Sequence, residues 1–332
     1  MISPTKMSTE TAEAPMAAAR MLEQNREGLR DLAKLFRSRN PSHIVTCARG
    51  SSDNAASYFK YLSEISLGLP CCSIGASVVS IYGAKMNFRD TMLISISQSG
   101  KSPDIIAFQM EAKRAGIPTI VITNDVNSPL AKDADICLPL YAGPELSVAA
   151  TKTFITSAAL LAAVVNAFDS NAQLSAALDR LPADLAEALK IDWDDIVNVV
   201  AQSKSLYVLG RGPSLPMAQE AALKLKETSG IHAEAFSAAE VMHGPMELVQ
   251  SGFPIVSFVP SDSAARTTLA SVAQLEKAGA RILPTVFQPT LSTALDPISI
   301  IQTFYVCAER VARQLERDPD APRLLKKVTE TH

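Results

Sequence analysis

Two halves of this chain repeat the same landmarks at a nearly constant spacing. In each half an apolar run leads into an Arg-Gly pair, a second apolar run follows, and an Ala-Gly pair comes after that. The spacing between matching landmarks is 162 or 163 residues, and such self-similarity marks a duplicated structural unit. The sequence therefore predicts two copies of one unit. The matched residues are Gly50 and Gly212, Met92 and Ile255, and Ala115 and Ala278.

Within each copy, short apolar and β-branched runs alternate with longer segments of helical periodicity. In the first copy the expected strands are 44–47, 92–97 and 119–123, and the expected helices are 54–67 and 104–115. This alternation predicts parallel sheets that are covered by helices on both faces. We therefore expect an α/β protein with two tandem flavodoxin-like, doubly wound domains.

The length of 332 residues also fits two domains, and 47% hydrophobic with 20% charged residues is typical of globular chains. We expect an N-terminal helical segment at 1–20 and a first domain at 21–169. A second domain is expected at 188–317, and a C-terminal tail at 318–332. A connecting helical segment, with Pro182 inside it, would join the two domains.

Charge and cysteine content limit which binding partners and which cellular compartment we expect. The 31 basic and 34 acidic residues give a net charge of −3 without any block of like charge, so neither nucleic acid nor a membrane is an expected partner. No secretory signal pattern opens the chain. Five cysteines without a C-x-x-C pair fit reduced thiols. We therefore expect a cytoplasmic protein.

Three serines and a glycine follow the second strand of the first copy. Ser97, Ser99, Gly100 and Ser102 stand where a buried strand turns into a helix, and Pro103 fits the first helical position. The free N–H groups and the dipole of a helix N-terminus attract anions, most often phosphate. An ordinary capped helix after a polar loop would show the same pattern. A second expected strand that also ends in polar residues supports the phosphate interpretation.

That second strand end is the sequence Arg49-Gly50-Ser51-Ser52. It follows the expected strand 44–47, so Ser52 and its neighbours would lie at the same sheet edge as the serine loop. Ligands of doubly wound sheets bind beyond the carboxyl ends of the strands. We therefore expect the two loops to share one pocket.

In the second copy, one helix carries alternating acidic and basic residues. Helical spacing places Glu220, Lys224 and Glu227 on one face. Such a face is usually solvated, but it can also hold a carboxylate base beside an ammonium group. His243 precedes Gly-Pro, which predicts an accessible turn, and histidine is a natural proton carrier near neutral pH. No histidine pair has the spacing of metal ligands, so we expect no metal. We expect no other cofactor either.

These motifs together resemble the sugar isomerase (SIS) fold family. The likeness is strongest to the isomerase half of glucosamine-6-phosphate synthases and to the stand-alone glucosamine-6-phosphate deaminases. It covers nearly the whole chain, and the ordered set of motifs is far more specific than any single one. The matching segments are 97–102, 148–152, 222–227, 231–235, 243–245 and 324–329.

The resemblance implies a role for each matching residue. Glu227 would move a proton between C1 and C2 of a sugar phosphate, and Lys224 would assist it electrostatically. His243 would open the sugar ring from a neighbouring subunit, which implies a homodimer. Lys326 would approach the open-chain carbonyl. The implied substrate-binding residues are Ser52, Ser97, Gln98, Ser99, Ser102, Val148 and Ala149.

Two positions depart from the family's usual pattern. Ala150 stands where a serine is usual, so one contact to a sugar hydroxyl is in question. Arg49 stands where the usual loop begins with cysteine, which adds a charge at that position.

The resemblance also bears on the reaction. The synthases carry an N-terminal glutaminase domain, whereas only about 40 residues precede the first expected strand here. We therefore expect isomerising deamination of glucosamine 6-phosphate to fructose 6-phosphate and ammonia. A fructosamine-6-phosphate deglycase, a galactosamine-6-phosphate deaminase or another phosphosugar isomerase would use a similar pocket. A non-catalytic sugar-phosphate sensor is the alternative outside the enzymes.

Overall fold

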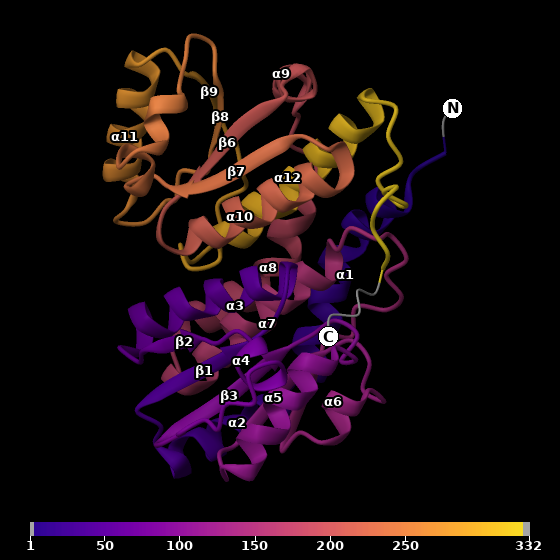
Figure 1. Ribbon diagram of the computed structural model, residues 1–332, viewed down its shortest axis with the longest axis vertical. Coiled ribbons are helices and arrows are strands. Elements are labelled where there is room, and N and C mark those ends of the chain that lie inside the picture. Colours follow the sequence, from indigo (N-terminus) through magenta and orange to yellow (C-terminus); the bar gives the residue numbers. More distant parts are fainter. Residues whose placement is uncertain (1–2, 328–332) are drawn as a thin grey trace. The chain divides into compact units, whose positions relative to one another are not determined.

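The computed structural model describes residues 3–327 (Figure 1). This part of the chain divides into two compact units. Unit 1 takes residues 3–15, 146–151 and 180–327, and unit 2 takes residues 16–145 and 152–179. Helices α1 (Lys6–Gln24) and α8 (Ala172–Ala188) each contribute residues to both units.

Unit 2 is built on a five-stranded parallel sheet with the strand order β2-β1-β3-β4-β5. The strands are β1 (His43–Cys47), β2 (Cys71–Ser73), β3 (Thr91–Ile96), β4 (Thr119–Thr123) and β5 (Ile136–Pro139). The helical elements are α2 (Arg26–Arg39), α3 (Ser51–Leu62), η1 (Ser63–Leu67), α4 (Ser77–Ser80), α5 (Pro103–Arg114), α6 (Pro129–Lys132) and α7 (Lys152–Asp169).

Unit 1 is built on a four-stranded parallel sheet with the order β7-β6-β8-β9. Its strands are β6 (Ser205–Gly210), β7 (His232–Ser237), β8 (Pro254–Ser257) and β9 (Arg281–Pro284). Its helical elements are α9 (Asp194–Gln202), η2 (Gly212–Ser214), α10 (Leu215–Lys224), η3 (Leu225–Ser229), η4 (Glu240–Met242), η5 (Pro245–Leu248), α11 (Ala265–Lys277) and α12 (Asp296–Gln314).

The two sheets share one topology, which confirms the predicted duplication. In both, the first strand lies between the second and the third, and the fourth follows the third. Parallel neighbours of this kind need crossover connections, which α3 and α10 begin at equivalent points. The α/β class and the tandem doubly wound domains are therefore confirmed. The expected domain boundaries stay predictions, because the compact units are discontinuous along the chain.

The long helix of each copy ends in the same unusual way. Helix α3 continues into the π-helical turn η1 and stops at Gly68, and α10 continues into η3 and stops at Gly230. Both glycines are left-handed, with φ of 62° and 63°, and they lie 162 residues apart. π-helical turns are rare and are often found at functional sites. In unit 1 this turn carries Glu227.

Helix α7 is the central helix of unit 2. It is long and apolar enough to cross a membrane by length and composition, and it is the only described helix that meets this test. However, every side chain from Lys152 to Val165 is buried, and the helix packs against α2 and α3. Burial against other helices is how a core helix of this composition behaves.

Candidate functional site

In unit 2 the two predicted loops lie at one edge of the sheet. Strands β1 and β3 are parallel neighbours, and Cys47 pairs with Ser95, so their carboxyl ends are adjacent. The chain leaves β1 through residues 48–50 into α3, and it leaves β3 through residues 97–102 into α5. Two helix N-termini therefore begin at the same edge, as the sequence predicts.

The serine hydroxyls of the β3–α5 loop (97–102) fold back onto the loop itself. Ser97 Oγ accepts a hydrogen bond of 3.1 Å from Gly100 N, and Ser99 Oγ accepts one of 3.3 Å from Lys101 N. This confirms that both hydroxyls point into one turn. Gly100 has φ of +62°, and a Cβ at this position would overlap the hydroxyl of Ser128. Only glycine therefore fits at the centre of the loop.

Ser102 occupies the predicted N-cap position of α5, and Pro103 follows at the first helical position. Its side chain, however, forms no capping hydrogen bond with any described residue and is partly exposed. The hydroxyl is therefore available to a ligand. Gln98 is also partly exposed, and its carbonyl accepts a hydrogen bond of 3.0 Å from Asn124 N, which anchors the loop to the end of β4.

The β1–α3 loop (48–50) also leaves space beside polar groups. Gly50 caps α3 with φ of +56°, and a Cβ built on it would meet no described atom within 4 Å. Ser52, in the first turn of α3, is half-buried. Asp53 follows it and accepts a hydrogen bond of 3.1 Å from Ser73, while burial raises the pKa of its carboxyl. The loop thus offers open space beside polar groups.

In unit 1, Lys224 lies between two carboxylates. Its ammonium pairs with Glu227 and lies 3.5 Å from Glu220. The side chains of Lys224 and Glu220 are 1% and 0% exposed, whereas Glu227 is 23% exposed. Tyr305 donates a hydrogen bond of 3.3 Å to Glu220, which helps to hold that buried carboxylate. Among these three charged groups, Glu227 is the one that solvent or a ligand can reach.

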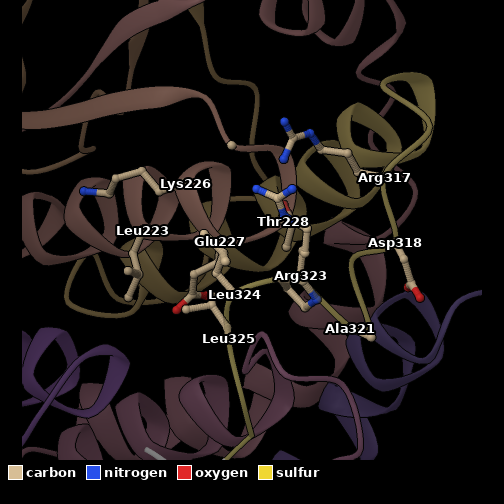
Figure 2. A pocket seen from close by; sticks show the side chains of 12 residues that line it. Leu223, Lys226, Glu227, Thr228, Arg317, Asp318, Ala321, Arg323, Leu324 and Leu325 are labelled. Atoms are coloured by element: carbon tan, nitrogen blue, oxygen red, sulfur yellow. The ribbon is translucent and has the colours of Figure 1, made fainter.

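A cavity of about 620 Å³ opens beside Glu227, between the end of α10 and the tail (318–327) (Figure 2). Most of its wall is apolar, and its charged side chains come from both elements. Figure 2 shows Glu227 next to Leu324 and Leu325, while the Lys226 ammonium points away from the tail. The lining residues are Leu223, Lys226, Glu227, Thr228, Gly230, Arg317, Asp318, Ala321, Pro322, Arg323, Leu324 and Leu325.

The tail is fixed to the segment Leu146–Thr151 within unit 1. Val148 N donates a hydrogen bond of 3.1 Å to the carbonyl of Asp320, and Lys327 Nζ donates one of 2.7 Å to the carbonyl of Ser147. Lys326, the tail lysine that the resemblance implies, is exposed. Lys327 is therefore the tail lysine held against the segment that carries the predicted substrate-binding residues.

The two predicted substrate-binding residues of this segment, Val148 and Ala149, differ in exposure. Val148 is half-buried, whereas Ala149 is fully buried, so Ala149 offers a ligand no exposed side-chain surface in this chain. Glu10 supports the segment from α1, and its carboxylate accepts hydrogen bonds from the backbone N–H groups of Leu146 and Ser147. The N-terminal helix thus helps to position this segment.

His243 lies where the sequence predicts it, on an exposed turn between η4 and η5. It does not line the cavity beside Glu227, although both residues belong to unit 1. The described chain therefore does not bring its own His243 into that cavity. A histidine from a second copy, as the resemblance implies, stays a prediction.

Several contacts of the site have no local sequence pattern. These are the pairing of Arg49 with Asp104, the bond from Lys327 to Ser147, and the arginines of the cavity. In the sequence, only Arg49 pointed to any of these contacts, because it departs from the family's usual pattern. Among the described residues no cluster of three His, Cys, Asp or Glu side chains is arranged to hold a metal ion.

A scan against protein-family models matches the SIS domain at residues 38–167 and 200–290. The first curated relatives are glutamine–fructose-6-phosphate aminotransferases of the isomerizing type, at 30–34% identity; they include those of Pyrobaculum aerophilum, Halobacterium salinarum and Thermococcus kodakarensis. The matches take in 72%, 92% and 98% of this chain. The chain spans about half the length of these relatives, from 43% to 58%.

Several solved structures cover almost all of the chain, among them the following three. A candidate phosphosugar isomerase of Silicibacter pomeroyi is 40% identical, with a TM-score of 0.92 over 96% of this chain and all of its own. The C-terminal domain of the glucosamine-fructose-6-phosphate aminotransferase of Francisella tularensis is 27% identical, with a TM-score of 0.85 over 96% and 98%. A glucosamine-6-phosphate deaminase of Thermotoga maritima, at 21% identity and a TM-score of 0.81 over 98% and 100%, shows the shared fold alone.

Proposed function

The chain belongs to the SIS domain family, and from this premise we propose that it is a sugar-phosphate isomerase that deaminates glucosamine 6-phosphate. The reaction would consume water and yield fructose 6-phosphate and ammonia. The observation that carries the proposal is the pairing of Glu227 with the buried Lys224 at the wall of a cavity.

This pair suits a proton transfer between neighbouring carbons. Glu227 is accessible, whereas Lys224 is buried and held between two carboxylates. A fixed ammonium orients the Glu227 carboxylate, and it stabilises the negative charge that develops as the enolamine forms. Glu227 would take the proton from C2 and return it to C1. The resulting imine carbon at C2 would then add water and release ammonia.

The serine loop would hold the phosphate of this substrate. The N-terminus of α5 and the hydroxyl of Ser102, which makes no capping hydrogen bond, would donate to it, whereas the amides of Gly100 and Lys101 already donate to Ser97 and Ser99. Ser52 would contact the sugar from the first turn of α3. Gln98 and Ser99 are accessible from the same loop. This assignment rests on chemistry that suits an anion, and a bound sugar phosphate would test it directly.

Two further roles complete the proposal. His243 would protonate the ring oxygen when the pyranose opens, and its exposed position suits donation to the cavity of a second copy in a homodimer. The tail would close the site near the carbonyl carbon, with Lys326 or its neighbour Lys327 as the cation there. We also keep the proposal that the enzyme works in the cytoplasm and needs no cofactor.

The decisive assay measures ammonia release from glucosamine 6-phosphate by the purified protein without any other addition. We expect turnover by the wild type and a loss of roughly 1,000-fold or more in kcat for Glu227→Gln, because the amide cannot accept the proton. Glu276→Gln, an exposed carboxylate on α11, is the matched control and should keep full activity. No ammonia from the wild type would reject deamination.

One other function has a specific observation in its favour. The Silicibacter pomeroyi protein, at 40% identity, is described only as a candidate phosphosugar isomerase. An aldose–ketose isomerase of a sugar phosphate without an amine would use the same carboxylate and the same loop. A substrate panel that compares kcat/KM for glucosamine, galactosamine and fructosamine 6-phosphates and for their amine-free counterparts would separate these functions. Binding without turnover of any of them would favour a sensor.

A further inference from the structure

Arg49 is tied to the helix that follows the serine loop. Its Nε and Nη2 both donate to Asp104 Oδ2, at 3.0 and 2.7 Å. Asp104 is the second residue of α5, two positions after Ser102, and its side chain is only 3% exposed. The pair therefore links the β1–α3 loop to the β3–α5 loop, and it fixes the guanidinium at the edge where the two loops meet.

The guanidinium still has donors to offer. Arginine carries five N–H groups, and Asp104 takes one from Nε and one from Nη2. The structure gives Nη1 no partner among the described residues, and the Arg49 side chain is 45% exposed. A half-exposed guanidinium with one edge fixed and the other edge free is oriented to bind a second anion.

The charges around Arg49 explain why an anion site here needs a cation. The carboxylates of Asp104 and Asp53 both stand in the first turn of a helix at this edge, where a phosphate would accept N–H groups. Like charges would repel that phosphate. Arg49 pairs with Asp104 and so offsets the charge of that carboxylate. Burial raises the pKa of Asp53, and the charge of Arg49 acts in the opposite direction. Lys101, the other nearby cation, pairs at 3.1 Å with Asp125.

We propose that Arg49, oriented by Asp104, is a recognition residue for the phosphate group of the substrate. This inference rests on the proposed sugar-phosphate function and adds to the serine loop a contact that the family's usual loop lacks. Its free N–H groups would donate to phosphate oxygens, while the ion pair with Asp104 holds the fork in place. The residue that replaces the usual cysteine is thus part of the binding site.

The test measures the binding of inorganic phosphate, which requires no turnover. Isothermal titration at constant ionic strength compares the wild type with Arg49→Gln, Arg49→Lys and the control Arg114→Gln. Arg114 lies on the same helix α5 and pairs with Glu111, so its loss removes a similar ion pair away from the loops. Thermal unfolding without phosphate shows whether each variant is folded.

We expect a Kd for phosphate about 10- to 100-fold weaker in Arg49→Gln, as for the loss of a charge-assisted contact. Arg49→Lys keeps the positive charge but not the forked guanidinium, so its Kd for phosphate should be about 3- to 10-fold weaker than that of the wild type. The Kd of Arg114→Gln should equal that of the wild type. With glucosamine 6-phosphate, KM should rise by the same factor in Arg49→Gln while kcat changes little, because the contact is uniform along the reaction.

An unchanged Kd in a folded Arg49→Gln protein would overturn the inference and leave the proposed function standing. If Arg49→Gln does not fold, Arg49→Lys decides, and an unchanged Kd in that variant overturns the inference equally. Phosphate binding that depends on Arg49 in a protein that turns over no sugar phosphate would support the inference and reject the function. A fall in kcat alone, with KM and Kd unchanged, would show a structural role and contradict it.

Discussion

The backbone N–H of Lys6 donates a hydrogen bond of 2.7 Å to Asp320 Oδ2, so the C-terminal tail caps the first helix of the chain. Met7 N donates to the other carboxylate oxygen at 2.8 Å. The carbonyl of Asp320 in turn accepts the N–H of Val148. One residue thus joins the N-terminal helix, the tail beside Glu227 and the segment that carries Val148.

Replacing Asp320 by alanine should loosen this junction. The loss of an N-cap costs about 1 kcal/mol, so we expect a small fall in the free energy of unfolding and a larger fall in turnover, because the tail lines the cavity. Urea unfolding and the ammonia assay measure the two effects. Asn171→Ala removes a local cap, the 3.0 Å bond to Leu174 N, and should lower stability alone. Equal turnover in both variants would contradict this.

The tail lysines make a matched pair of variants. Lys327→Gln removes the bond to the Ser147 carbonyl, whereas Lys326→Gln changes an exposed side chain. We expect the larger loss of kcat, roughly tenfold or more, from Lys327→Gln, because only Lys327 is held in place by a contact. A larger loss from Lys326→Gln would instead support the lysine that the family resemblance implies, with the tail rearranged around substrate.

Subunit mixing tests whether His243 acts across a dimer. Glu227→Gln and His243→Ala proteins should each be inactive, since each lacks one group of the proposed reaction. Coexpression should restore about a quarter of wild-type activity if the subunits pair at random, because half of the dimers then hold one complete site. A double variant coexpressed with the wild type is the control for assembly. Inactive mixed dimers would place His243 and Glu227 in the same subunit's site.

Gly100 should tolerate no side chain. Gly100→Ala must place a Cβ at φ of +62° and within 2.6 Å of Ser128 Cβ. We expect a loss of about 2–4 kcal/mol in the free energy of unfolding together with weaker phosphate binding. Gly116 has φ of +75° and open space around it, so Gly116→Ala should cost only about 1 kcal/mol. Similar losses in both variants would show that Ser128 moves aside.

Thiol reactivity tests which cysteines of strands β1 and β2 are buried. Burial raises the pKa of the Cys47 and Cys71 thiols to about 12, while Cys72 is exposed. Ellman's reagent at a pH of about 8 should modify Cys72 within seconds to minutes and leave Cys47 and Cys71 unmodified until the protein unfolds. Rapid labelling of Cys47 would contradict the packing of β1.

The raised pKa values of Cys47 and Cys71 also make the free energy of unfolding depend on pH. Both folded-state values lie above the ordinary value of 9.0, so the folded state favours the neutral thiols. The stability they contribute is complete below about pH 9 and is lost as the pH rises through about 12. The wild type and Cys71→Ala should therefore differ less in their free energy of unfolding, measured with urea, near about pH 11 than near about pH 8. An unchanged difference would show that burial does not set this pKa.

The local elements of the fold follow from the sequence because their causes are local. Strand β4 spans the expected residues, β3 begins one residue before its expected position, and α5 begins at Pro103 after the expected N-cap Ser102. Apolar runs, a serine at the N-cap and a proline after it act within a few residues of chain. The short strands β2 and β5 escaped prediction, since three or four residues carry little periodicity.

The sequence by itself determined the duplication, the α/β class, the serine loop and the Lys224–Glu227 spacing, because each depends on neighbours along the chain. Only the tertiary structure decided that Arg49 meets Asp104, that Lys327 rather than Lys326 binds the Ser147 carbonyl, and that the tail walls the cavity beside Glu227. These contacts join residues 55 to 180 positions apart. Such pairs depend on strand order and on where the tail returns, and no local pattern encodes either.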